Sequence, residues 1–163
     1  MIGRAGGWFP GRNRYGAFVC DAQKGKIRHL SQLFLTGELW GIDADIIQKA
    51  SVVAFSKQHA GVEIPFFPST LVEDTFAYTL TNYVKFAQKT LQLKPPLRLI
   101  AGATDVLGYR MAVGNGYAGE VVDDHIIHET TITNFQSQPI ELLIPFFEYF
   151  WEQCGLDRHQ YRQ

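Results

Sequence analysis

The chain has 163 residues, of which 46% are hydrophobic and 19% are charged. This composition excludes an intrinsically disordered chain, because disorder combines low hydrophobicity with a high net charge. The 15 basic residues nearly balance the 16 acidic ones, and the net charge of -1 also excludes a chain that binds polyanions over its whole surface. Its two cysteines are too few for a disulfide scaffold.

No stretch of the sequence has the apolar length of a targeting or membrane segment. The first residues lack the apolar core of a secretory signal, and no run approaches the roughly 20 apolar residues of a membrane span. We therefore expect a cytoplasmic protein with reduced thiols and without a membrane-spanning segment.

Positive charge is concentrated at the beginning of the chain. Residues 1–28 contain six lysines and arginines and one acidic residue, Asp21, which gives six minus one, or +5. A glycine-rich segment of this charge is typical of a linker, or of a basic arm that contacts an acidic partner. We therefore predict a Gly/Arg-rich linker or basic arm over residues 1–16 and a single α+β domain over residues 17–163.

An antiparallel meander is predicted directly after the basic segment. Three short stretches read as strands, residues 17–20, 27–35 and 38–42. Gly25 and Gly37 lie between them, where a tight turn favours a residue that adopts a positive φ. Connections this short favour antiparallel pairing of the strands.

The next stretch is predicted to contain a short helix and two strands. Asp43 and Asp45 are suited to cap a helix that reaches Ala50. Pro65 argues against a central position for the second of the two strands, because proline donates no ladder hydrogen bond. These strands are expected over residues 51–55 and 62–67.

The strongest periodic signal predicts a helix over residues 71–91. Thr70 and Glu73 match a capping box, in which each side chain accepts a hydrogen bond from a free backbone amide of the other residue. Pro95 and Pro96 end any continuation of this helix. The apolar residues recur at spacings of three and four and form one stripe, made of Phe76, Leu80, Tyr83, Val84, Ala87 and Leu91.

A final helix is predicted over residues 139–154, where it is stopped by Gly155. Pro145 either kinks this helix or begins a shorter one. Two long helices beside strands predict an α+β fold in which one mostly antiparallel sheet carries both helices on one face. The strands that precede the final helix are expected over residues 97–101, 105–113 (with a bulge at Gly108) and 125–133.

Aromatic residues cover nearly every face of the final helix. So much apolar surface at the end of a chain packs against the domain core or against a partner, which would be a second copy or a neighbouring domain. These residues are Phe146, Phe147, Tyr149, Phe150 and Trp151.

Three stretches share a pattern with one bacterial family. They run from Gly37 to Asp43, from Pro68 to Tyr109 and from Leu143 to Gly155. This pattern resembles the region that follows the AlbA-like domain in bacterial Schlafen-type AlbA-like proteins, which are described as ATP-binding or DNA-binding regulators. The resemblance implies an excised or free-standing accessory domain. It assigns no functional residue here, because the residues that give the family its nucleic-acid role lie in the preceding domain.

Basic and aromatic residues near the start of the chain are the candidate binding residues. Arginine pairs with phosphates, and aromatic rings stack on unpaired bases. The same composition suits a linker that docks its aromatic residues, and a tryptophan such as Trp40 also suits a core position. We expect a non-catalytic accessory domain that binds a partner, a ligand or nucleic acid through Arg4, Arg12, Arg14, Lys24, Lys26, Arg28 and Trp40.

A small, metal-assisted hydrolase is the competing hypothesis. Its candidate residues are Asp105, Asp123, His125, His128 and Glu129, and the last four form the densest set of possible metal ligands together with Asp124. Residues three apart on a strand point to opposite faces, so His125 and His128 would diverge from a common metal. Asp105 equally suits an Asx turn at the end of a strand. Because these residues do not form a converging set, we predict neither a metal nor a cofactor.

Overall fold

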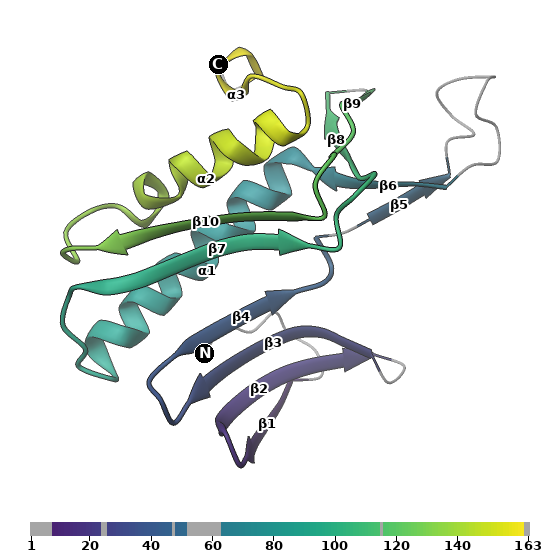
Figure 1. Ribbon diagram of the computed structural model, residues 1–163. Helices are drawn as coiled ribbons and strands as arrows, with labels where there is room; N and C mark the ends of the chain where they lie inside the picture. Colours follow the sequence, from purple (N-terminus) through teal and green to yellow (C-terminus); the bar gives the residue numbers. More distant parts are fainter. Residues whose placement is uncertain (1–7, 24–25, 47, 52–62, 115, 162–163) are drawn as a thin grey trace. The chain divides into compact units, whose positions relative to one another are not determined.

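A computed structural model of the chain describes residues 8–23, 26–46, 48–51, 63–114 and 116–161 (Figure 1). The chain forms two compact units, Met1–Ile46 and Ile47–Gln163. This division differs from the predicted one, which placed a boundary after residue 16 and a single domain beyond it.

The first unit is a four-stranded antiparallel meander in the order β1-β2-β3-β4. The predicted strands over 17–20, 27–35 and 38–42 are confirmed as β2, β3 and β4. The segment predicted as a linker or basic arm contains β1, whose residues pair with β2 along its whole length. The strands are β1 (Trp8–Asn13), β2 (Gly16–Gln23), β3 (Lys26–Phe34) and β4 (Leu39–Asp43).

The second unit combines three helices with two sheets, and its α1 and α2 pack against each other (Figure 1). β7 and β10 form an antiparallel ribbon, and the other sheet has the order β5-β6-β8-β9. The predicted α+β class is confirmed, but the strands of the chain are distributed over three sheets instead of one. The elements are β5 (Gln48–Ser51), β6 (Glu63–Pro68), α1 (Ser69–Lys89), β7 (Leu97–Thr104), β8 (Arg110–Val113), β9 (Gly116–Ala118), β10 (His125–Ile132), α2 (Pro139–Gln153) and α3 (Arg158–Tyr161).

The short helix predicted after Asp43 is wrong. The Asp43 carboxylate accepts a hydrogen bond from the backbone amide of Asp45 at 2.9 Å, which makes a turn, and residues 48–51 form β5. The strand predicted over 51–55 lies outside the described residues except for Ser51, the last residue of β5. Pro65 lies in β6, which has a neighbour on each side, but pairing with β8 begins only at Phe66.

Helix α1 follows the predicted apolar stripe, but the predicted capping box is wrong. Pro68 is the N-cap, and no side chain caps this end of the helix. Glu73 is instead 2% exposed and accepts hydrogen bonds from Trp151 at 2.9 Å and from Arg158 at 2.9 and 3.0 Å. One buried carboxylate therefore joins α1, α2 and α3.

The strand predicted over residues 105–113 is reduced to Arg110–Val113. The preceding residues turn, because Asp105 and Gly108 have φ values of 58° and 77°. The strand predicted over 125–133 and the helix predicted over 139–154 are confirmed as β10 and α2. Helix α2 continues through Pro145.

Aromatic residues of α2 form the centre of the second unit's core. Phe146, Phe147, Phe150 and Trp151 are at most 2% exposed. The ring of Phe146 lies 4.8 Å from that of Phe76 on α1, and the ring of Phe150 lies 5.1 Å from that of Phe67 on β6. These four side chains therefore pack in the core, which is one of the two alternatives that we predicted. They are not available to a partner.

No helix in the part of the chain that the structure describes is long and apolar enough to cross a membrane.

Candidate nucleic-acid interface

The meander of the first unit presents one face rich in aromatic residues. Residues directly opposite each other in paired strands share a face of the sheet. Phe18 on β2 lies opposite Gly11 on β1 and Gln32 on β3, and Gln32 lies opposite Trp40 on β4. The alternation of each strand adds further members, so the aromatic face consists of Phe9, Gly11, Phe18, Gln32, Phe34 and Trp40.

Gly11 allows an aromatic ring to lie flat across the edge strand. A β carbon at this position would lie 2.4 Å from the tip of the Phe18 ring, and two further ring atoms would be within 3.0 Å. Gln32 is 8% exposed, and its side-chain amide donates a 3.4 Å hydrogen bond to Asn13. The centre of the face is thus packed and carries one buried amide.

The margins of the aromatic face are open to solvent. Phe9 on β1 is 58% exposed and Trp40 on β4 is 54% exposed, although large aromatic side chains are usually well buried. The Trp40 ring lies 5.4 Å from the Phe34 ring at a tilt of 58°, so part of the indole is fixed and part is accessible. Exposed rings on an open sheet are typical of surfaces that stack bases.

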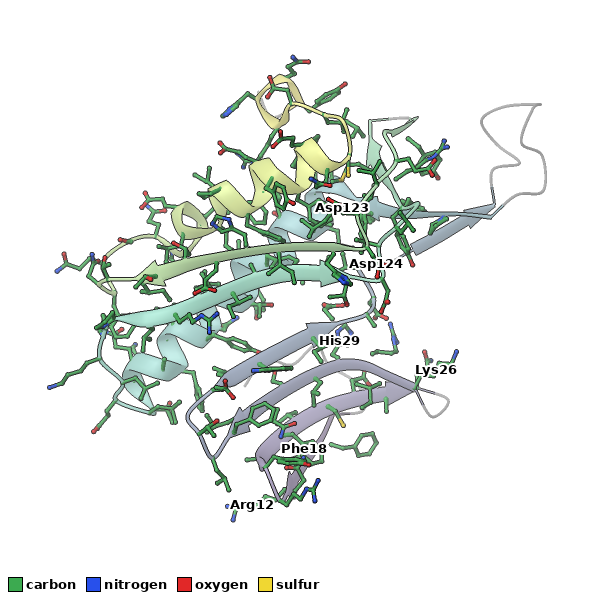
Figure 2. The ribbon with its side chains drawn as sticks, viewed as in Figure 1. Arg12, Phe18, Lys26, His29, Asp123 and Asp124 are labelled. Carbon is green, nitrogen blue, oxygen red and sulfur yellow. The ribbon has the colours of Figure 1, made fainter. Side chains whose placement is uncertain are left out.

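The structure does not bring the predicted basic residues together. Arg12 lies near the end of β1 and Arg14 lies in the turn between β1 and β2, whereas Lys26 begins β3 at the other end of the sheet (Figure 2). The register places Arg12 opposite Ala17, on the face opposite the aromatic one. Arg4 and Lys24 lie outside the described residues.

The turn between β1 and β2 holds Arg14 beside the aromatic face. Asn13 accepts hydrogen bonds from the backbone amides of Tyr15 at 2.9 Å and Gly16 at 3.1 Å. Gly16, the first residue after this turn, lies opposite Phe34 of the aromatic face, so the turn adjoins that face. The guanidinium of Arg14 lies 4.6 Å from the centre of the Tyr15 ring, and both side chains are exposed. Arg14 is therefore the predicted basic residue best placed for a ligand on this face.

Arg28 belongs to a cluster of charged residues at the other end of the meander. It donates two hydrogen bonds to Asp45, one of them 2.8 Å long. His29 lies between two carboxylates, with Nδ1 at 3.3 Å from Asp43 and Nε2 at 3.1 Å from Asp45. The hydrogen bond from Arg28 lowers the pKa of the Asp45 carboxyl below its ordinary value. Arg28 thus links β3 to the turn that follows β4, and its ligand-binding role stays a prediction.

Replacement of Asp45 by asparagine is expected to destabilise the first unit at neutral pH and to lose this effect in acid. The pKa of Asp45 is lower in the folded chain, so its stabilising contribution is present above its unfolded pKa of about 4 and is lost as the pH falls through the folded pKa. Urea unfolding followed by the NMR signal of the Trp40 indole measures this difference. The exposed Asp123 of the second unit supplies the control variant Asp123→Asn, and a difference between wild type and Asp45→Asn that persists in strong acid would contradict the assignment.

The residues of the predicted hydrolase site are spread over β10, the residues directly before it and the turn after β7. His125 is exposed and His128 is half-buried on opposite faces of β10, and Glu129 pairs with Arg98 at 2.6 Å. Asp105 lies in a left-handed turn, and Asp123 and Asp124 precede β10 (Figure 2). Within the described ranges, no three His, Cys, Asp or Glu side chains are grouped so that they could hold a metal ion.

Neither cysteine has the character of an activated nucleophile in this fold. Cys154 is fully buried at the C-terminal end of α2, and burial raises the pKa of its thiol to about 12. Cys20 is half-buried within β2. Both are free thiols.

Comparisons of the chain with protein-family models, with curated proteins and with solved structures find no match. The relationship to Schlafen-type AlbA-like proteins therefore stays a prediction.

Proposed function

We propose that the chain is a non-catalytic accessory domain of a DNA-binding regulator, and that its meander binds single-stranded nucleic acid. The observation that carries this proposal is the aromatic face, on which Phe9 and Trp40 are more than half exposed. Bases would stack on these rings, and a phosphate would pair with Arg14 in the adjoining turn. A stacking contact with one base contributes about 1–3 kcal/mol, so the loss of either ring should weaken binding measurably.

The geometry favours single strands over a duplex. In a duplex the faces of the bases are already stacked on each other, whereas in a single strand they are available to aromatic side chains. Duplex readers commonly insert a helix into the major groove. The described residues of the first unit form strands and turns only, so this unit offers no such helix.

Fluorescence anisotropy of labelled single-stranded and duplex oligonucleotides across a salt series tests the proposal. We expect the full chain to bind the single strand at least about tenfold more tightly, with a difference of ~1.4 kcal/mol or more in binding free energy. The variant Arg14→Ala should reduce the slope of log K against log salt by about 0.7, the value for one lost phosphate contact with a single strand.

The matched control removes one exposed positive charge from the second unit. Lys85 is exposed on α1, and the variant Lys85→Ala should leave the affinity and the salt slope unchanged. Equal binding of single strand and duplex, or no binding at low salt, would overturn the proposal.

A further inference from the structure

The ribbon of β7 and β10 leaves one regular strand edge open. Among the described residues, β7 and β10 pair only with each other. Edge strands expose unpaired backbone amides and carbonyls, and soluble proteins protect them with charged residues, prolines or bulges. Each strand has one charged residue, and these two, Arg98 and Glu129, pair with each other. Helix α2 packs mainly against β10, so the edge of β7 is the less protected one.

The two faces of the ribbon differ in exposure. Ala101 on β7 and Ile126 on β10 are buried on the face that meets the second unit's core. On the outer face, Ile100 is 55% exposed and Ile127 is 53% exposed. An open edge and exposed isoleucines on the same strand pair are typical of a surface that another strand extends.

We propose that β7 pairs with β7 of a second copy of this chain and forms a symmetric homodimer. Antiparallel pairing about Ala101 keeps outer residues opposite outer residues, which a strand with a period of two requires. In this register large side chains meet small ones. Ile100 lies opposite Gly102 of the second copy, and Leu99 lies opposite Ala103.

The pairing joins the two ribbons into one four-stranded antiparallel sheet, in which α1 and α2 of both copies lie on the same side. The two-fold axis passes through Ala101, so each copy presents the same surface, as in the commonest type of dimer. Gly102 has no side chain to obstruct the incoming Ile100, and the neighbouring Ile127 extends over Gly102 with its Cγ1 3.1 Å from the position of a β carbon. An isoleucine of each copy therefore gains an apolar neighbour in the other copy.

Light scattering coupled to size exclusion measures the molar mass of the full chain and of single variants. We expect twice the monomer mass of 18.4 kDa for the wild type and 18.4 kDa for Ile100→Lys, because the two lysines would be diagonal neighbours across the axis and would repel each other. The control Val122→Lys changes a more exposed residue, 73% exposed, outside the ribbon and should remain a dimer.

A charge-complementation experiment tests the contact itself. Ile100→Lys and Ile100→Glu should each be monomeric alone and should form a mixed dimer when combined. A monomeric wild type, a dimeric Ile100→Lys variant or a monomeric Val122→Lys variant would each overturn the proposal. The readout is molar mass, so it is independent of whether the meander binds nucleic acid.

Discussion

Replacement of Arg158 by alanine is expected to destabilise the second unit by about 3–5 kcal/mol, because it removes the arginine that pairs with the buried carboxylate of Glu73. Glu73 is 2% exposed, and the side chain of Arg158 is 13% exposed. The hydrogen bond from Trp151 to Glu73 satisfies one lone pair and does not replace the charge of the guanidinium. The loss should also release α3, which Arg158 begins.

Urea unfolding followed by circular dichroism at the helical band measures this effect, since α1, α2 and α3 all lie in the second unit. Arg98→Ala is the matched control. The Arg98 and Glu129 side chains form a similar two-pronged pair, but they are 67% and 52% exposed. Solvent screens such a pair, so its removal should change the midpoint little. An equal loss of stability in the two variants would contradict the claim that the burial of Glu73 strengthens its pair with Arg158.

Substitution of Gly119 by alanine is the second change with a large expected effect, about 3 kcal/mol of destabilisation. Gly119 has a φ of 51°, a left-handed conformation that disfavours side chains. A β carbon there would lie 1.4 Å from the carbonyl oxygen of Cys154, so the backbone at the end of α2 would have to move. A carbonyl fixed by the helix end cannot yield as a flexible side chain does.

Thermal unfolding of Gly119→Ala and Gly116→Ala separates the clash from the general effect of adding a methyl group. A β carbon at Gly116 would have no atom within 4 Å, and this glycine has an ordinary φ in β9. We expect a lower melting temperature for Gly119→Ala alone. Similar melting temperatures for the two variants would mean that the loop before β10 does not approach α2 as closely as described.

Local periodicity was sufficient to predict the elements whose pattern is contained in one segment of the chain. The stripe from Phe76 to Ala87 marks α1, and the β-branched run before Thr133 marks β10, because each pattern is contained in one segment. β1 was missed because its regular structure depends on pairing with β2, and its glycine and proline, Gly11 and Pro10, indicate a loop when read alone. Glu73 fitted a capping box in sequence, but its partners Trp151 and Arg158 are distant in the chain.

The candidate site was only partly predictable for the same physical reason. Trp40 was singled out by its residue type, whereas Phe18 and Gln32 join it on one face only through the register of three strands. The irregularity between Asp21 and Ala22 changes the pairing only beyond Asp21, so it leaves Phe18 and Gln32 in register. Counting charges along the sequence grouped Arg12 with Arg28, although the meander places them at opposite ends of the sheet.

The affinity of the Trp40→Ala variant for a single-stranded oligonucleotide tests the proposed function most directly. Stacking on one ring contributes about 1–3 kcal/mol, so the variant should bind about tenfold more weakly than the wild type. Tyr78→Ala removes a ring that is 63% exposed on α1 and should bind as the wild type does. An unchanged affinity of Trp40→Ala, with the fold intact by circular dichroism, would contradict the assignment of the aromatic face as the binding surface.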